Sequence, residues 1–155
     1  MVRDIYHQRE AAQDRLSPSR AKVVLFDTDT LSQVLKRAPP PTLLARLAVV
    51  PAEQQFTSAI TVGEMVYGSY RSNRPDHFLR QLEERLWPNI RILPFNRAAA
   101  ETYGRLRAQL EETATPLAEP DLRIAAIALT HDLTMVTGNV RHFSRVPGLR
   151  IETWL

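Results

Sequence analysis

The sequence contains no cysteine, and this absence excludes several kinds of site. Disulfides, a thiolate nucleophile and a zinc site built on sulfur all require cysteine. A chain without disulfides is typical of a reducing compartment, so we expect a cytoplasmic location. Long apolar runs are also missing, because stretches such as Ile124 to Leu129 fall far short of the roughly 20 residues that cross a bilayer. We therefore expect no membrane span, and the first residues show no secretory signal.

Several catalytic motifs are absent as well. There is no glycine-rich phosphate loop, and no serine stands in a nucleophile-elbow pattern. The histidines at positions 7, 77, 131 and 142 lack the spacing of a metal-binding pair. These observations argue against a nucleotide-binding loop, an elbow-type serine hydrolase and a histidine-based zinc site.

What is present fits one ordinary globular domain. The chain has 155 residues, of which 44% are hydrophobic and 24% charged, so one packed core is expected. Its 20 basic and 17 acidic residues give a formal charge of +3, and arginine supplies nearly all of the positive side. Guanidinium groups suit bidentate contacts with phosphate, but an ordinary solvated surface explains this charge equally well.

Strand and helix patterns alternate along most of the chain. Residues 1–22 are polar and predict a mobile extension, with a possible short helix from Ile5 to Leu16, and residues 23–155 form the predicted folded domain. The predicted strands are Val23 to Phe26, Phe56 to Ile60, Ile90 to Leu93, Leu133 to Val136 and Leu149 to Ile151. The predicted helices are Asp29 to Lys36, Pro41 to Val49, Val62 to Arg71, Asp76 to Leu86, Arg97 to Glu112 and Leu122 to His131. This alternation predicts an α/β sandwich with a central, mostly parallel sheet of about five strands between layers of helices.

Three acidic residues follow predicted strands or begin predicted helices. Asp27 comes directly after the first strand, at the edge where open α/β sheets bind ligands, although it could simply cap a helix. Glu64 follows the second strand, and Thr61-Val62-Gly63-Glu64 also matches a capping box. Asp121 shares the apolar face of its helix, although it too could be an N-cap.

Carboxylates brought to one sheet edge would require a cation. Two unit charges about 4 Å apart repel by roughly 4 kcal/mol at an effective dielectric constant of about 20. Mg²⁺ or Mn²⁺ would offset this repulsion, since hard cations take oxygen ligands and can activate water against a phosphodiester. Thr137-Gly138-Asn139 follows the fourth strand and could orient water or phosphate at this edge, or merely form a turn.

These residues resemble PIN-domain ribonucleases, in particular the VapC toxins of bacterial toxin–antitoxin pairs, from about Val23 to Trp154. The similarity is carried by four segments: Phe26 to Leu31, Thr57 to Gly68, Asp121 to Ala128, and Val136 to Phe143 with the following Arg145 to Leu149. The resemblance implies a PIN-like three-layer sandwich in which Asp27, Glu64 and Asp121 bind the metal. It places a fourth site position at Asn139, where many relatives carry aspartate, so the binding of a second metal ion is in doubt.

The resemblance also implies a function and partners. It implies a metal-dependent endoribonuclease toxin that is inhibited by a cognate VapB-type antitoxin, with helices near residues 29–49 and 62–86 forming the antitoxin groove. A homodimer and a toxin–antitoxin hetero-oligomer are expected on the same basis. We expect four arginines to steer the RNA substrate: Arg71, Arg74, Arg141 and Arg145.

Two other functions remain compatible with the sequence. Phe26 to Thr30 also resembles the nucleophile motif of haloacid-dehalogenase phosphatases, but the usual glycine after the second aspartate is missing. The chain could instead be a non-catalytic binding module with an acidic cleft, a possibility that Asn139 keeps open.

Overall fold

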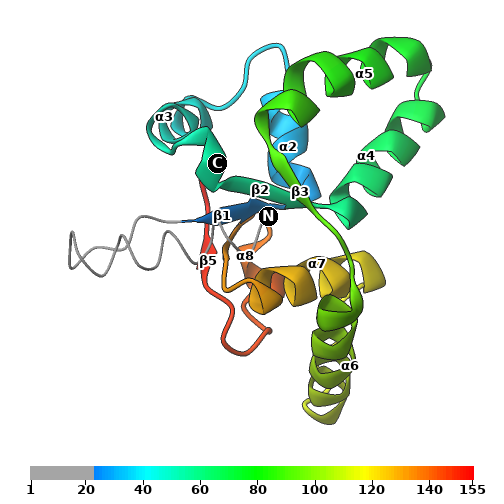
Figure 1. Cartoon of the computed structure of the whole chain (residues 1–155), viewed down its shortest axis with the longest axis vertical. Coiled ribbons are helices and arrows are strands. Elements are labelled where there is room, and N and C mark those ends of the chain that lie inside the picture. The colour runs from blue at the N-terminus through cyan, green and yellow to red at the C-terminus, as the bar shows by residue number, and fades with distance from the viewer. Residues whose placement is uncertain (1–22) are drawn as a thin grey trace.

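The computed structural model describes residues 23–155, which form a sheet with helices on both faces (Figure 1). The predicted extension at residues 1–22, with its possible helix, lies outside the described residues. No helix in the described part of the chain is long and apolar enough to cross a bilayer.

The central sheet is entirely parallel. Its strands are β1 (Val24–Phe26), β2 (Gln55–Ser58), β3 (Arg91–Leu93), β4 (Thr134–Val136) and β5 (Ile151–Glu152). They lie in the order β3-β2-β1-β4-β5, and all four pairings are parallel. The chain therefore builds outward from β1 to β3 and then crosses to the other side of β1, which confirms the predicted α/β architecture.

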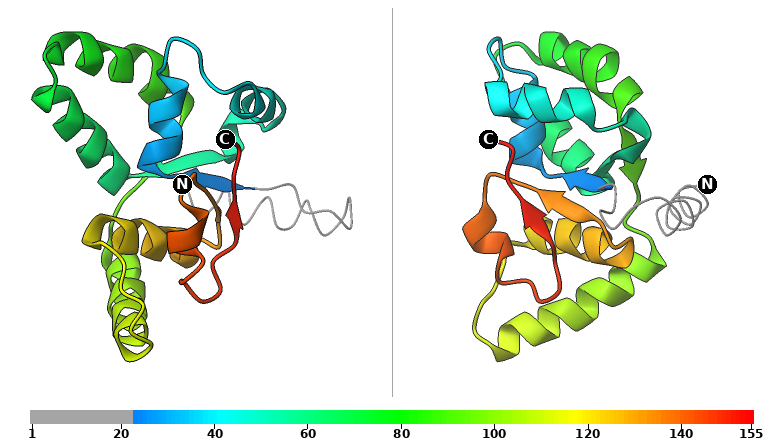
Figure 2. Two further views of the ribbon diagram at one scale, coloured as in Figure 1. Left: turned by 180° about the vertical axis from the view of Figure 1, so that it is seen from behind. Right: turned by 90° about the vertical axis from the view of Figure 1, so that its left-hand side faces the viewer.

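One helical layer covers the upper face of the sheet in Figure 1. It contains α2 (Thr28–Val34), α3 (Pro41–Val49), α4 (Ala59–Arg71) and α5 (Pro75–Gln81), and α5 continues into a π-helical turn, η2 (Leu82–Leu86). The other layer contains α6 (Arg97–Glu112), α7 (Glu119–Thr130) and α8 (Val140–Phe143). The two views of Figure 2 show the same separation of the helices into layers.

Two hydrophobic cores fill the spaces between the layers, as the alternation of side chains along β1 requires. Val24 and Phe26 point into the core beneath α2 to α5, whereas Leu25 points into the core above α6 and α7. Trp154 closes the first core with its ring edge-to-face against Phe26, at 5.3 Å between centroids. The predicted three-layer sandwich is confirmed.

Several predicted boundaries were wrong. The residues Ala59 and Ile60, predicted as strand, begin α4 because the Ser58 side chain accepts a hydrogen bond from the Thr61 N–H and caps the helix. The last strand starts at Ile151, since the Leu149 N–H bonds to the Val146 carbonyl in a turn. The short helix α8 was not predicted.

Candidate active site

Asp27 stands at the carboxyl end of the central strand and is 4% exposed. One carboxylate oxygen accepts a hydrogen bond from the Thr30 N–H at 2.9 Å, so Asp27 does cap α2. The other accepts a hydrogen bond from the Thr137 hydroxyl at 2.5 Å. Burial raises the pKa of the Asp27 carboxyl, and the hydrogen bonds from Thr137 and Thr30 partly offset that increase. The capping interpretation is thus confirmed, but the same carboxylate also joins the end of β1 to the end of β4.

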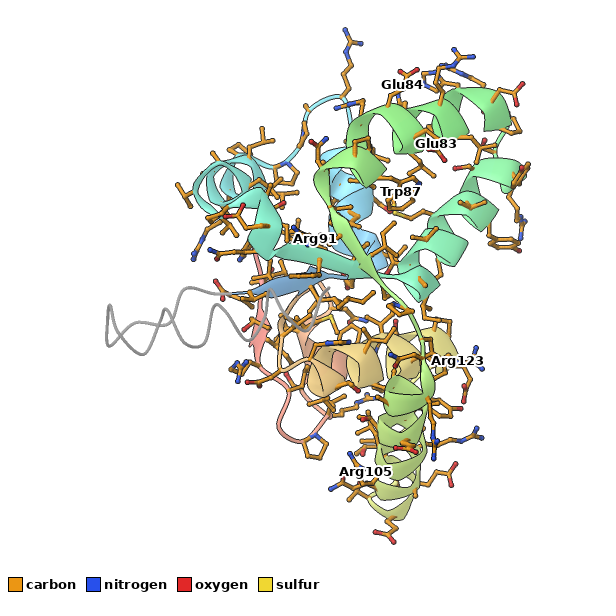
Figure 3. The ribbon with its side chains drawn as sticks, viewed as in Figure 1. Glu83, Glu84, Trp87, Arg91, Arg105 and Arg123 are labelled. Atoms are coloured by element: carbon orange, nitrogen blue, oxygen red, sulfur yellow. The ribbon has the colours of Figure 1, made fainter. Side chains whose placement is uncertain are left out.

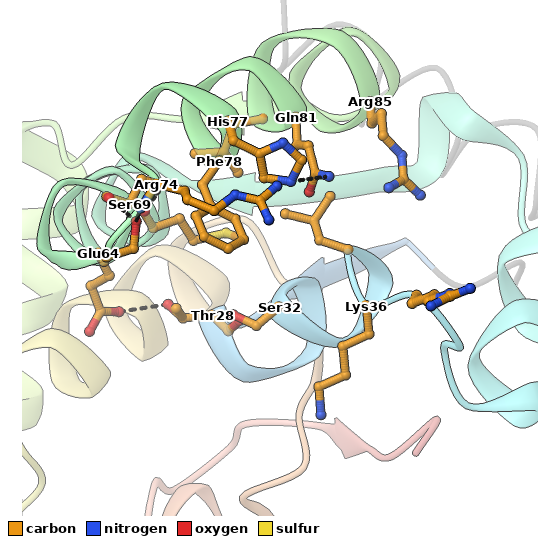
Figure 4. A pocket seen from close by; sticks show the side chains of 16 residues that line it. Thr28, Ser32, Lys36, Glu64, Ser69, Arg74, His77, Phe78, Gln81 and Arg85 are labelled. Carbon is orange, nitrogen blue, oxygen red and sulfur yellow. Dashed lines mark hydrogen bonds between the residues drawn. The ribbon is translucent and has the colours of Figure 1, made fainter.

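Glu64 lies in the second turn of α4, because this helix begins three residues earlier than its sequence predicted. The capping-box interpretation of Glu64 is therefore wrong: Ser58 is the N-cap, and Glu64 is too far along the helix to reach it. Instead, Oε1 of Glu64 accepts a hydrogen bond from the Thr28 hydroxyl at 2.6 Å (Figure 4). This contact holds the Glu64 side chain against the first residue of α2, directly after Asp27.

Asp121 is the third residue of α7, whose N-cap position is Ala118, so the N-cap interpretation of Asp121 is also wrong. Partial burial is the main cause that raises the pKa of its carboxyl. The carboxylates of Glu64, Asp27 and Asp29 raise that pKa further, while His142 acts in the opposite direction. Asp121 therefore shares an electrostatic environment with the acids that follow β1 and β2.

The chemistry of these residues fits a divalent cation, although their side chains are not gathered as ligands. Asp27, Glu64 and Asp121 offer oxygen donors of the kind that Mg²⁺ and Mn²⁺ prefer, and the repulsion felt by Asp121 is what a cation would relieve. Within residues 23–155, no three His, Cys, Asp or Glu side chains are close enough to hold a metal together. Binding would require these carboxylates to turn toward one another.

The segment after β4 carries a structural link that its sequence did not reveal. Thr137 is fully buried, and its hydroxyl donates to Asp27 while accepting the Asn139 N–H at 2.8 Å. This hydroxyl is therefore engaged within the protein, contrary to the expectation that it orients water or phosphate. The strand register pairs Phe26 with Val136, and this pairing could have placed Asp27 beside Thr137 had the register been known.

Asn139 is connected to the acidic residues through its backbone. Its side-chain amide lies 2.6 Å from Nδ1 of His142, one turn along α8. His142 and Thr28 are further residues that the sequence did not single out, because their roles depend on neighbours from other segments.

A groove of about 950 Å³ extends from Glu64 between α2, α4 and α5 (Figure 4). Among residues 23–155, four cationic side chains line it, namely Lys36, Arg37, Arg74 and Arg85, and Glu64 is the only carboxylate in that described part of the lining. Its lining includes no residue of α3, although the range 29–49 was expected to form an antitoxin groove.

The four arginines expected to steer RNA are placed differently from one another. Arg74 lines the groove, and Arg71 lies near the end of α4 with its guanidinium bonded to Tyr67. Arg141 is exposed on α8. Arg145 donates a hydrogen bond to the Pro116 carbonyl at 3.0 Å, so it braces the loop before α7.

Comparison with known proteins gives consistent matches. Residues 24–149 match the PIN domain family. Ribonuclease VapC2 of Haemophilus influenzae is 33% identical over 131 residues, which cover 84% of this chain and 97% of that protein. The tRNA(fMet)-specific endonuclease VapC of Salmonella typhimurium is 37% identical over 97 residues, or 63% of this chain and 73% of that protein.

Solved structures give the same picture. The fold of this chain is shared with a chain of a DNA-bound VapBC from Salmonella typhimurium at a TM-score of 0.80 and 31% identity, covering 86% of this chain and 99% of the other. VapBC2 from Rickettsia felis, bound to a DNA fragment from its promoter, gives a TM-score of 0.78 and 26% identity, covering 85% and 98%.

Proposed function

The chain belongs to the PIN domain family, and from this premise we propose that it is a divalent-metal-dependent endoribonuclease, the toxin of a toxin–antitoxin pair. The named ribonucleases among its relatives support the activity. The metal requirement is supported by the positions of the three acids: Asp27 follows β1, Glu64 is hydrogen-bonded to the next residue, Thr28, and Asp121 is repelled by both carboxylates, which a divalent cation would offset. Burial of Asp27, with both oxygens hydrogen-bonded, is unfavourable for the phosphoaspartate of a haloacid-dehalogenase phosphatase.

The sheet edge that carries Asp27, Glu64 and Asp121 is called here the acidic edge, and the proposed mechanism assigns a role to each of its residues. Asp27, Glu64 and Asp121 would hold Mg²⁺ or Mn²⁺, which supplies neutralising charge and activates water for attack on a phosphodiester. Thr137 and Thr28 fix the orientation of Asp27 and Glu64 through their hydroxyls. Asn139, held by Thr137 and turned toward His142, completes the edge without adding negative charge.

The RNA would pass over the acidic edge with cationic side chains on either side. Arg74 in the groove and Arg141 on α8 are suited to contact phosphates, because neither forms an ion pair with another residue in 23–155. Arg71 belongs to the same proposed set. Arg145 contributes indirectly, by bracing the loop that leads to α7.

A VapB-type antitoxin is the proposed partner, since the solved relatives named VapBC are complexes. The antitoxin would inhibit cleavage by covering the acidic edge. We also propose that the toxin works in the cytoplasm and assembles as a homodimer within the hetero-oligomer.

The test is RNA cleavage by the chain purified free of any partner. With Mg²⁺ or Mn²⁺, we expect wild-type protein to cleave RNA, and Asp121→Asn and Glu64→Gln to lose at least about a hundredfold in rate, since even outer-shell changes at metal sites cost 10–100-fold. Glu101→Gln is the matched control, because Glu101 is an exposed glutamate on α6, in the helical layer on the other face of the sheet from Glu64. Equal cleavage by all four proteins would exclude the proposed activity, and antitoxin binding without cleavage would favour a non-catalytic binding module.

A further inference from the structure

An exposed tyrosine and arginine form a fixed pair on α4. Tyr67 is 60% exposed, and Arg71 follows it by one helical turn. The Arg71 guanidinium donates a hydrogen bond to the Tyr67 hydroxyl at 3.0 Å and stands over its ring, 5.7 Å from the centroid. An exposed aromatic ring is thus held in place by a cation rather than by the core.

The pair stands on the same side of α4 as Glu64. Tyr67 and Arg71 are three and seven residues beyond Glu64, positions that share a helix face, whereas Thr61, Met65 and Ser69 are buried on another face. At 1.5 Å per residue, Tyr67 lies about 4.5 Å farther along the helix axis than Glu64. A nucleotide next to one held at Glu64 is therefore within reach of the Tyr67 ring.

A second pair with the same spacing shows what a purely structural pair looks like. On α6, Arg107 donates to the Tyr103 hydroxyl at 2.9 Å. Glu111 and Glu119 neutralise Arg107 at 3.1 and 3.3 Å, and the Tyr103 hydroxyl donates to Glu119 at 2.7 Å. By contrast, no carboxylate within residues 23–155 forms an ion pair with Arg71. The charge on α4 is thus available for an anionic ligand.

We propose that Tyr67 and Arg71 form a nucleotide-binding platform that positions single-stranded RNA beside the acidic edge. A base of the RNA stacks on the Tyr67 ring, and the Arg71 guanidinium contacts the adjoining phosphate. Aromatic rings stack on any base, and arginine adds a cation–π contribution and charge attraction. This inference rests on the proposed ribonuclease function and adds a positioning site to it.

The first test compares two exposed tyrosines of the same helix. Binding of a short fluorescein-labelled single-stranded RNA would be measured by anisotropy in EDTA, so that no cleavage occurs. We expect Tyr67→Ala to weaken binding about tenfold, within the range found for loss of one base–aromatic stack. Tyr67→Phe keeps the ring and should stay near the wild type. Tyr70→Ala is the matched control, because Tyr70 is 66% exposed and makes no ring contact with Arg71.

The second test asks whether the tyrosine acts on a base. Wild-type protein and Tyr67→Ala would be compared on RNAs that carry an abasic nucleotide at successive positions around the cut. At one position the abasic change should weaken wild-type binding but add nothing to Tyr67→Ala, because both changes remove the same stack. In cleavage assays Tyr67→Ala should raise KM about tenfold with little change in kcat.

The outcomes separate this inference from the proposed function. If wild-type protein cleaves RNA but Tyr67→Ala and Tyr70→Ala bind it equally well, the platform is excluded and the ribonuclease remains. If Tyr67→Ala loses affinity only for the antitoxin, Tyr67 belongs to a protein interface and the platform is again excluded. If wild-type protein and Asp121→Asn both fail to cleave, the proposed function fails whatever the binding data show.

Discussion

Two helices of this protein carry the same tyrosine–arginine pair, and their surroundings differ. On α6 the pair Tyr103–Arg107 contacts Glu111 and Glu119, and Arg97 and Arg123 nearby each pair with one glutamate. On the side of α2, α4 and α5, neither Arg71 nor the groove cations Lys36, Arg37, Arg74 and Arg85 form ion pairs within residues 23–155. Figure 3 shows Arg105 and Arg123 on the α6–α7 side and Glu83 and Glu84 on the helix above the sheet.

The difference indicates which charges serve the fold and which serve a ligand. Most of the arginines on the α6–α7 surface pair with glutamates of the same surface, with Arg105 as the exception among residues 23–155. The edge formed by α2, α4 and Asp121 at the start of α7 combines acids that repel one another with cations that lack partners among the described residues, an arrangement that favours binding of a metal ion and an anionic polymer.

The change in melting temperature on adding a divalent cation should distinguish the two regions most clearly. A ligand that binds only the folded state adds about 2.7 kcal/mol of stability at a hundredfold excess over its Kd. We expect Mn²⁺ to raise the melting temperature of the wild type, and Asp121→Asn to lose most of that increase. Glu119→Gln, which removes a carboxylate already paired with Arg107 and Arg123, should keep it. Thermal melts in EDTA and in Mn²⁺ measure this, and equal increases in all three proteins would remove the distinction between the regions.

Removing a buried hydroxyl should give the next largest effect. Thr137→Val deletes the hydrogen bond to Asp27 and the acceptor of the Asn139 N–H, and each group left unsatisfied in the interior costs ~1–3 kcal/mol. The counterpart on the other surface is Thr102→Val, which removes one exposed and one part-buried hydrogen bond. It should cost less than about 0.5 kcal/mol, because the Thr130 hydroxyl keeps its bond to the Ala126 carbonyl. Urea denaturation compares the two. Equal losses would mean that Thr137 does not support Asp27.

The Asp121 carboxyl should make the stability of the protein depend on pH. The pKa of Asp121 is raised above its ordinary 3.8, so the folded protein binds this proton more readily than the unfolded chain. Ionisation above the raised pKa therefore opposes folding. In EDTA at neutral pH we expect Asp121→Asn to melt at a higher temperature than the wild type, with the gain shrinking as the pH falls toward 3.8.

The matched control for this experiment is Asp132→Asn. Asp132 pairs with Arg150 at 2.9 Å, so its loss removes an attractive contact and should lower the melting temperature slightly at neutral pH. A decrease for both variants would show that Asp121 is not under repulsion.

The smallest expected effect concerns the two arginines themselves. Arg107→Gln loses ion pairs with Glu111 and Glu119 and should lower the melting temperature a little, less so at high salt. Arg71→Gln loses no ion pair with any residue from 23 to 155 and should leave the melting temperature close to that of the wild type, whatever the salt concentration. A salt-dependent loss for Arg71→Gln would mean that its charge is engaged in the fold.

The sequence predicted the fold well wherever a local signal marked an element. Helix α6 spans Arg97–Glu112 as predicted, because the Asn96 side chain caps it, and α3 begins at Pro41 as predicted after the proline run. The start of α4 was wrong, since Ala59 and Ile60 extend an apolar run and the cap at Ser58 left no distinct pattern. Helix α8 has four residues, too few to show helical periodicity.

The site was predictable in its placement but not in its contacts. Acids that follow parallel strands lie at one sheet edge, and this rule agrees with the positions of Asp27 after β1 and of Glu64, which bonds to Thr28, the next residue. It could not show that Thr137 and Thr28 bind them, because those contacts depend on strand register and on the angle between helices. For the same reason Arg145, expected to face RNA, was not seen to brace Pro116.

The hydrogen bond between Asp27 and Thr137 joins residues 110 positions apart and so has a consequence for synthesis of the protein. Asp27 leaves the ribosome well before its partner, because 110 positions separate it from Thr137. A growing chain therefore cannot fix this carboxylate until synthesis has passed Thr137. The hydrogen bond that orients this side chain thus forms only after strands β1 to β4 have all been made.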